Sequence, residues 1–317
     1  DISSSLEQIR QLETAGCEIV RMAVPDTASV ITFAAIKKEI NIPLVADIHF
    51  DHKLALAAID AGADKIRINP GNIGSSDRIK AVLNACSAAG IPIRIGVNGG
   101  SLEKDILQHY GHPVPQALVE SAARHIRLCE EHGFYDIVVS IKASDVPGMI
   151  EANRLFSQKF DYPLHLGVTE SGTRQSGSIR SAVGIGTLLA EGIGDTIRVS
   201  LSGDPVSEIY VAKKILSALN LRRSGVTVIS CPTCGRAAYD VAAIAEELEA
   251  RTENIPKEMQ VAVMGCVVNG PGEAREADLG IAGAGDGKVM LFENGNKIDI
   301  LPLEGIVDLL VERILKR

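Results

Sequence analysis

The stretch KLALAAIDAGADKIRIN, residues 53–69, sets an apolar helical pattern directly before a short strand. Gly62 stands just past the helix, where glycine adopts the left-handed backbone conformation that ends many helices without strain. The β-branched run that follows begins at Lys65 and continues to Asn69. A helix that feeds a strand across a glycine is typical of the repeating unit of α/β proteins, in which the strands form a parallel sheet.

The same unit recurs through the first 220 residues. Six further strands are predicted near residues 18–21, 43–46, 91–95, 136–141, 163–167 and 195–200. Seven strands that alternate with helices favour a (β/α)8 TIM barrel of which one unit is unseen. A doubly wound open sheet is the alternative, but the glycine-rich dinucleotide fingerprint expected after its first strand is absent.

The pattern changes near residue 224. Short strands are predicted at about residues 226–229, 260–264, 279–282 and 288–292, with helices at about 238–251 and 304–316. A chain of 317 residues is long for one compact core and comfortable for two. We therefore predict a barrel domain over residues 1–223 and a small α+β domain over residues 224–317.

The amino-acid composition limits the kinds of partner that this chain is expected to bind. The net charge is −8 and Trp is absent, so neither the basic face nor the stacking aromatics of nucleic-acid binders are evident. No run approaches the ~20 apolar residues of a membrane span, and the chain, which opens on Asp1, shows no signal-peptide pattern. We expect no membrane contact, and a location in the bacterial cytoplasm or, in a plastid-bearing organism, the plastid stroma.

Polar side chains gather at the carboxyl ends of the predicted strands, where barrel enzymes carry their active sites. Alternate residues of a strand share a face, so Arg67 and Asn69 point the same way, as do Arg198 and Ser200. The strand-end candidates are Arg21, Asp47, His49, Arg67, Asn69, Arg94, Asn98, Lys142, Arg198 and Ser200.

Four arginines and one lysine at one mouth would repel one another strongly without a counter-charge. Arg presents a planar fork that fits phosphate, and the set therefore predicts a phosphate or diphosphate substrate. The alternative is an ordinary barrel in which each Arg pairs with a neighbouring carboxylate. Glu170 lies just beyond a strand end among these cations, either as a general acid or base or as a structural counter-ion.

Three cysteines follow strands of the small domain. Cys231 and Cys234 form a CxxC directly after one strand, and Cys266 follows another in a loop rich in Gly and Pro. Three soft ligands suit zinc or an iron–sulfur cluster. The small domain contains no His for a Cys₃His zinc site, whereas Glu273 lies on the same loop and is placed to be a fourth ligand. A thioredoxin-like dithiol is the alternative, but it leaves Cys266 without a role.

Together these motifs resemble the 4-hydroxy-3-methylbut-2-enyl diphosphate synthase family in its bacterial two-domain form. The matching segments, from about residue 15 to 275, are AGCEIVRMAVP, PLVADIHF, KIRINPGNIG, IPIRIGVNGGSLEKD, SIKASD, HLGVTESG, EGIGDTIRVSLSGDP, SCPTCGR and MGCVVNGPGEA. The family has a TIM barrel followed by a small [4Fe-4S] domain. It also has one strand before the point at which this chain begins.

The resemblance implies reductive ring opening and dehydration of 2-C-methyl-D-erythritol 2,4-cyclodiphosphate, with electrons from ferredoxin or flavodoxin. It implies a homodimer in which the cluster of one chain caps the barrel of its partner. The strand-end residues and Asn269 become substrate contacts, and Glu170 and Glu273 become the catalytic candidates, with Glu170 as the acid. The implied cluster ligands are Cys231, Cys234, Cys266 and Glu273.

Three other functions fit parts of the pattern. A zinc-stabilised phosphate-binding barrel without a redox role predicts a colourless protein that tolerates air. An iron-sensing regulator that binds RNA or a protein predicts a basic or aromatic surface, which the composition does not supply. A pterin-binding barrel synthase shares the fold and an anionic substrate but does not need the three cysteines.

Overall fold

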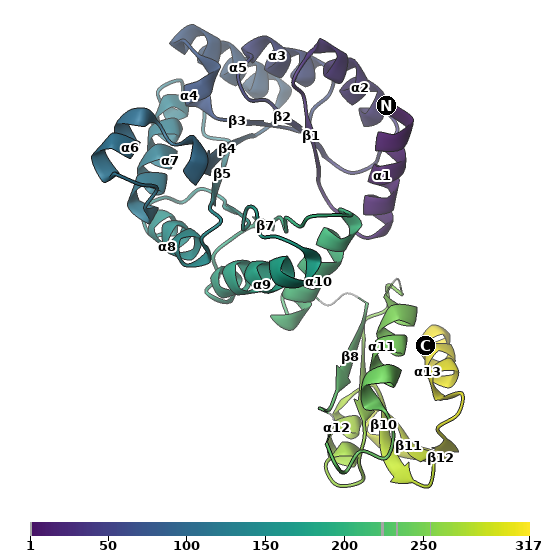
Figure 1. Ribbon diagram of the computed structural model, residues 1–317. Coiled ribbons are helices and arrows are strands. Elements are labelled where there is room, and N and C mark those ends of the chain that lie inside the picture. The colour runs from purple at the N-terminus through teal and green to yellow at the C-terminus, as the bar shows by residue number, and fades with distance from the viewer. Residues whose placement is uncertain (1, 223–224, 233, 254) are drawn as a thin grey trace. The chain divides into compact units, whose positions relative to one another are not determined.

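A computed structural model describes residues 2–222, 225–232, 234–253 and 255–317. The chain separates into two compact units, Asp1–Leu219 and Asn220–Arg317. Each unit is described by itself (Figure 1). No helix in the described ranges is both long and apolar enough to cross a membrane.

The first unit alternates strands and helices, and all seven predicted strands form. The strands are β1 (Val20–Ala23), β2 (Leu44–Asp47), β3 (Lys65–Ile68), β4 (Ile93–Asn98), β5 (Ile137–Lys142), β6 (His165–Leu166) and β7 (Thr196–Ile197). The helices are α1 (Ile2–Thr14), α2 (Thr27–Lys37), α3 (His52–Asp60), α4 (Pro70–Ile73), α5 (Ser76–Ala89), α6 (Lys104–Tyr110), α7 (Pro115–Glu130), α8 (Val146–Ser157), α9 (Arg174–Ala190) and α10 (Val206–Ala218).

The strands form a parallel inner wall inside a ring of helices, as Figure 1 shows. β1 to β5 pair in chain order within one sheet, and β6 pairs with β7. A parallel bridge between Val139 and Leu164 joins the two groups. This arrangement confirms the predicted barrel and brings the carboxyl ends of all seven strands to one mouth.

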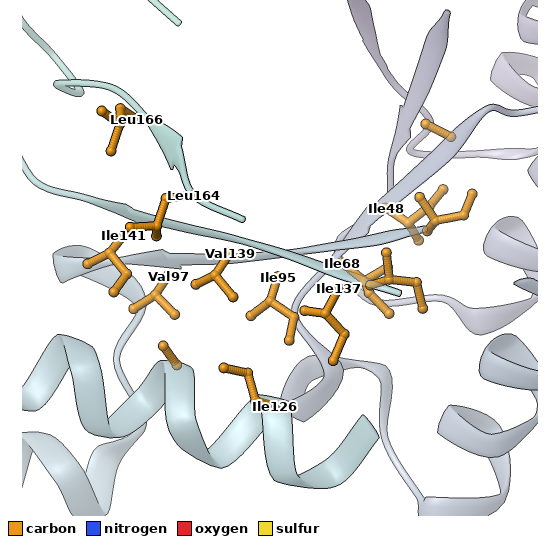
Figure 2. Close-up of a cluster of buried hydrophobic side chains, with 14 of the residues drawn as sticks. Ile48, Ile68, Ile95, Val97, Ile126, Ile137, Val139, Ile141, Leu164 and Leu166 are labelled. Carbon is orange, nitrogen blue, oxygen red and sulfur yellow. The ribbon is translucent and has the colours of Figure 1, made fainter. Parts of the chain in front are cut away.

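The apolar core of the barrel lies between the strand wall and the helices. Figure 2 shows Ile95, Val97, Val139 and Ile141 on one face of β4 and β5, with Ile126 of α7 across from them. Because strand residues alternate between faces, the opposite phase of these strands points into the space enclosed by the strand wall, which we call the lumen. Barrel lumens are usually filled by branched apolar side chains, whereas this one carries charged and polar residues.

At the amino-terminal end of the strand wall, aspartates that precede strands accept hydrogen bonds from backbone N–H groups of neighbouring strands. The Asp64 carboxylate accepts a hydrogen bond from the Leu44 backbone N–H at 2.7 Å, so the turn before β3 is tied to the start of β2. Asp195, just before β7, likewise accepts from the Leu164 N–H at 2.7 Å. Each bond satisfies a strand-end donor and fixes the register of two neighbouring strands.

The second unit is a five-stranded sheet with helices on both faces. Its elements are β8 (Val226–Ser230), α11 (Val241–Thr252), β9 (Met259–Met264), α12 (Gly270–Glu276), β10 (Leu279–Gly285), β11 (Lys288–Glu293), β12 (Asn296–Pro302) and α13 (Ile306–Lys316). β8, β9 and β10 are parallel, and β11 and β12 extend the sheet antiparallel. α11 and α13 pack on one apolar face and α12 on the other.

Two elements of this unit differ from the prediction. The segment after Cys266, expected to be a Gly/Pro-rich loop, turns into helix α12 at Gly270, because Pro271 in the first turn has the backbone angle of a helix and lacks only a hydrogen the helix does not use there. β12 was not predicted. Asn294 and Gly295 both have positive φ and form the tight turn that joins β11 to β12.

Candidate active site

Two arginines of the lumen share one carboxylate. Arg21 Nη1 on β1 lies 2.6 Å from Asp47 Oδ2, and Arg67 Nη1 on β3 lies 3.0 Å from Asp47 Oδ1. Asp47, at the end of β2, is only 4% exposed. Because each of its oxygens is engaged by a different guanidinium, Asp47 has little capacity left to neutralise the other cations of the lumen.

Two further cations are buried without such a partner. Arg94 on β4 and Lys142 on β5 are 7% and 6% exposed, and neither forms an ion pair within the part of the chain that the structure describes. Burial, and then the charges of Arg21 and Arg67, lower the pKa of Arg94 to about 9. Burial, and then the charge of Arg94, lower the pKa of Lys142 well below its usual value. These two side chains carry the unbalanced positive charge of the site.

Arg198 directly follows β7, and its backbone N–H donates to the Leu166 carbonyl on β6 at 2.9 Å. The charge of Arg198 lowers the pKa of Arg21, Arg94 and Lys142. Ser200 lies two residues further on, and its backbone carbonyl accepts a hydrogen bond from the Ser171 hydroxyl. The predicted convergence of four arginines and one lysine is therefore present.

Three buried polar atoms at the site have no hydrogen-bond partner among the described residues: Asn69 Oδ1, Arg94 Nε and His165 Nε2. Buried polar atoms are nearly always paired in folded proteins. A bound polyanion would pair with the buried cations and accept a hydrogen bond from the Arg94 Nε–H. Its hydroxyl groups could donate to Asn69 Oδ1.

Two glycines leave space for the side chains of the lumen cations. A methyl group on Gly96 of β4 would lie 2.6 Å from Arg67 Nε and Nη2. One on Gly167, just after β6, would lie 3.3 Å from Lys142 Nζ and 2.7 Å from the backbone oxygen of Arg198. Both glycines stand in the lumen-facing phase of their strands, and any larger residue would push a cation out of place.

The remaining predicted barrel residues lie at the rim. His49 follows β2, is exposed, and places Nδ1 3.5 Å from Arg67 Nη1. Asn98 ends β4 and is half-buried. Glu170 is exposed and has φ 53°, a left-handed conformation that is uncommon for a residue with a side chain. Strained backbone of this kind clusters at functional sites.

The cysteines lie past the ends of adjacent parallel strands in the second unit. Cys231 follows β8 and Cys266 follows β9, and the Gly265 N–H lies 3.2 Å from Cys231 Sγ. Backbone N–H groups of Asn269, Gly270 and Val268 at the start of α12 donate to the Cys266 sulfur and lower its pKa. A lowered pKa favours the thiolate, which is the form that binds metals.

Close backbone packing supports this loop. A methyl group on Gly283 would lie 2.3 Å from the Gly265 oxygen, and the Tyr239 hydroxyl donates to the Met264 carbonyl at 2.8 Å. Cys234 is exposed and neighbours residue 233, which is outside the described residues. Glu273 lies in the first turn of α12.

The acid and thiol groups of the described residues do not form a single-ion site: no three His, Cys, Asp or Glu side chains gather closely enough to hold one metal ion. Three cysteines and one carboxylate, without a histidine, are a donor set that suits an iron–sulfur cluster. Asn269, predicted as a substrate contact, belongs to the second unit, where its backbone N–H donates to the Cys266 sulfur.

Family models match both units of this chain. The GcpE TIM-barrel domain matches residues 1–213, and the GcpE protein C-terminal domain matches residues 227–316. The chain belongs to the GcpE family. This confirms the resemblance seen in the sequence and the predicted fold, a TIM barrel followed by a smaller domain.

Relatives of this GcpE chain share more than half of its residues. A protein of Caldanaerobacter subterraneus subsp. tengcongensis is 59% identical over 316 residues, which cover 100% of this chain and 89% of that protein. One of Clostridium perfringens is 57% identical over 314 residues, 99% of this chain and 90% of that protein. Both are named 4-hydroxy-3-methylbut-2-en-1-yl diphosphate synthase (flavodoxin). We assign the GcpE chain to the oxidoreductases, as predicted.

Among solved structures, the GcpE chain is similar to Yersinia pestis dihydropteroate synthase with a sulfonamide drug complex. The TM-score is 0.50 at 13% identity, over 70% of this chain and 87% of that one. At this identity the similarity shows the barrel fold alone.

Sequence reasoning missed several residues that shape the GcpE site. Gly96 and Gly167 lie in the same phase as the strand-end cations, which was a usable signal. His165 was recognised in the sequence as a polar strand-end residue but was assigned no role; it is lumen-facing on β6, and its Nδ1 lies 2.8 Å from Thr196 Oγ1. Lys65, two residues before Arg67 on β3, is lumen-facing too, and burial and the charge of Arg94 lower its pKa.

Proposed function

We propose that this chain catalyses the reductive ring opening and dehydration of 2-C-methyl-D-erythritol 2,4-cyclodiphosphate to 4-hydroxy-3-methylbut-2-enyl diphosphate. The observation that carries the proposal is the lumen, where Arg94 and Lys142 are buried cations with no carboxylate partner among the described residues. A cyclic diphosphate supplies two negative phosphoryl groups, and its hydroxyls suit the open Asn69 acceptor. The names of the 59% and 57% identical relatives support the same product.

The reaction needs two electrons and one proton for each water released. We propose that Cys231, Cys234, Cys266 and Glu273 hold a [4Fe-4S] cluster, which when bound supplies one-electron transfer. The lowered pKa of the Cys266 thiol and the two adjacent strand ends support this ligand set. Flavodoxin, which the relatives' names include, or ferredoxin is the proposed electron donor.

The chain's own residues bind, orient and protonate the substrate. The lumen cations hold the diphosphate, and the Asp47 carboxylate orients Arg21 and Arg67. Arg198 and Ser200 stand at the same mouth, and Asn98 and His49 line its rim. Glu170 is the proposed acid for the departing hydroxyl, on a loop whose backbone holds a left-handed conformation.

One preparation tests both parts of the proposal. Anaerobically purified protein is expected to show a broad band near ~400 nm and about four irons per chain. With reduced flavodoxin it should convert the cyclic diphosphate into the allylic diphosphate. A colourless protein with one zinc and no conversion would instead establish the zinc-stabilised phosphate-binding barrel.

We also propose that the active form is a homodimer in which each barrel uses the cluster of its partner. Mixing two inactive variants, Cys266→Ser and Glu170→Gln, should restore activity through heterodimers that contain one intact barrel–cluster pair. Subunits that exchange without any recovery would contradict the shared arrangement.

A further inference from the structure

Lys142 is the fully buried lysine of the lumen, and among the described residues it has no carboxylate partner. Lys65, the other lumen-facing lysine, is only half-buried. Lys142 ends β5 and is 6% exposed. Each neighbouring element contributes a charged or titratable group around it. These are Arg21 on β1, Asp47 on β2, Arg67 on β3, Arg94 on β4, His165 on β6, Arg198 after β7 and Glu208 on α10.

The two carboxylates in this set are already engaged. Both oxygens of Asp47 bind arginines, and Glu208 Oε1 accepts the Leu201 backbone N–H at 2.8 Å. The arginines keep their protons at neutral pH, since the guanidinium is too basic to lose one. An ammonium, in contrast, shifts its pKa readily when it is buried. Lys142 is therefore the cation that can relieve the repulsion by losing its proton.

We propose that Lys142 is a neutral amine in the ligand-free enzyme and takes up one proton from solvent when the cyclic diphosphate binds. The step is a protonation in which the amine becomes an ammonium and no other bond changes. It rests on the proposed function and deepens it, because it makes recognition of the polyanion a proton-coupled event.

The surroundings of the amine support this coupling. Burial, and then Arg94 and Arg198, lower the pKa of Lys142 well below its usual value. The Lys142 nitrogen lies close to Gly167, where a methyl group would stand 3.3 Å from it, and the side chain is buried. Two phosphoryl groups would offset the positive charge of the surrounding arginines and raise the pKa of the amine again.

His165 is the competing proton acceptor. Burial, and then the charge of Lys142, lower its pKa well below the usual value, and its Nε2 is buried without a partner among the described residues. An amine is intrinsically more basic than an imidazole by about four pKa units. When the anion arrives, the proton therefore goes first to Lys142.

Isothermal titration calorimetry of the holoenzyme without reductant measures the uptake. The cyclic diphosphate is titrated at pH 7.5 in non-phosphate buffers of different ionisation enthalpy. Each of its phosphorus atoms carries a single, strongly acidic oxygen, so the ligand does not titrate near neutral pH. Wild-type protein is expected to take up about one proton per site, and its affinity should fall up to tenfold per pH unit as pH rises.

Three variants assign the proton. Lys142→Arg has a permanent charge, so it should bind with no uptake and with little pH dependence. Lys142→Met should show no uptake and weaker binding. Lys65→Met, the matched lumen lysine, should keep the uptake.

The outcomes separate this inference from the proposed function. Wild-type binding without proton uptake overturns the inference alone. Uptake that survives in Lys142→Met but disappears in His165→Asn assigns the proton to the imidazole and also overturns it. A wild-type holoenzyme that does not bind the cyclic diphosphate removes the proposed function and the inference with it.

Discussion

The two units both present functional side chains at the ends of parallel strands, but they hold them differently. In the barrel, Arg94 and Lys142 belong to the strands themselves and are buried. In the second unit, Cys231 and Cys266 lie past the strands, in loops held by a few backbone contacts, and Cys234 is exposed. A site within strands is fixed by sheet register before any ligand arrives. Side chains on loops can still adjust their positions when they bind a group such as the proposed cluster.

The largest effect should come from the cysteine loop. Cys266→Ser is expected to lower turnover by at least roughly 10³-fold and to reduce bound iron, because oxygen is a poor substitute for a thiolate ligand. Binding of the cyclic diphosphate, measured by calorimetry, should stay within about twofold if the barrel site is independent. Cys17→Ser, in the first unit, is the matched control and should keep full activity. Normal iron and turnover in the Cys266 variant would exclude this cysteine as a ligand.

Removing a lumen cation should give the complementary result. Arg94→Met is expected to weaken binding of the cyclic diphosphate by about 10- to 100-fold, since a hydrogen bond to a charged group contributes about 1.5–3 kcal/mol. Iron content should not change. Lys38→Met, on the exposed surface after α2, controls for the loss of one positive charge. Equal loss of affinity in both variants would show that only net charge matters.

A pair of glycines tests how tightly each site is built. Gly96→Ala places a methyl group 2.6 Å from Arg67 and should displace it from Asp47, with about a tenfold loss of affinity, or ~1.4 kcal/mol. Gly235→Ala lies between Cys234 and Arg236, where a methyl group meets no atom within 4 Å, so cluster content and affinity should stay unchanged. If Gly235→Ala lowered cluster content or affinity while Gly96→Ala had no effect, the cysteine loop rather than the barrel lumen would be the more tightly packed site.

The smallest effect concerns a device common to both units. Asp278, just before β10, accepts the Gln260 N–H at 2.8 Å, as Asp195 does for Leu164. Replacing either with Ala should lower the free energy of unfolding by about 1–2 kcal/mol, because a strand-end donor loses its partner. Urea unfolding of the two variants measures this, and Asp161→Ala, on an exposed turn, is the control. A clear difference between the losses of unfolding free energy in the two variants would show that this hydrogen bond does not stabilise the two units equally.

Local patterns were sufficient to predict the strands and the inward-facing cations. The alternation of Ile93, Arg94 and Ile95 assigns one face to the core and the other to the lumen without knowledge of any partner. Pairings across strands were beyond reach, since the bond between Arg21 and Asp47 joins residues 26 positions apart and depends on register. Clearance at Gly96 depends likewise on where a long side chain from another strand comes to rest.

In the second unit, the amino-acid composition of the segment after Cys266 led to a wrong prediction of its secondary structure. A run rich in Gly and Pro suggested a loop after Cys266, yet Pro271 at the start of α12 favours a helix whose first N–H groups turn toward the sulfur. The Asn294-Gly295 pair is typical of a tight hairpin turn, and alternating apolar and polar residues follow it. These two features could have predicted β12, but they were not used.

The order of the first five strands has a consequence for how the chain is made. Each of β1 to β4 pairs with the strand that follows it in the sequence, so each new strand that emerges during synthesis finds its partner already present. Contacts between chain neighbours close short loops and form quickly. The wall can thus grow in the direction of translation, and Asp64, which directly precedes β3 and binds the start of β2, is placed to set the register between these two strands.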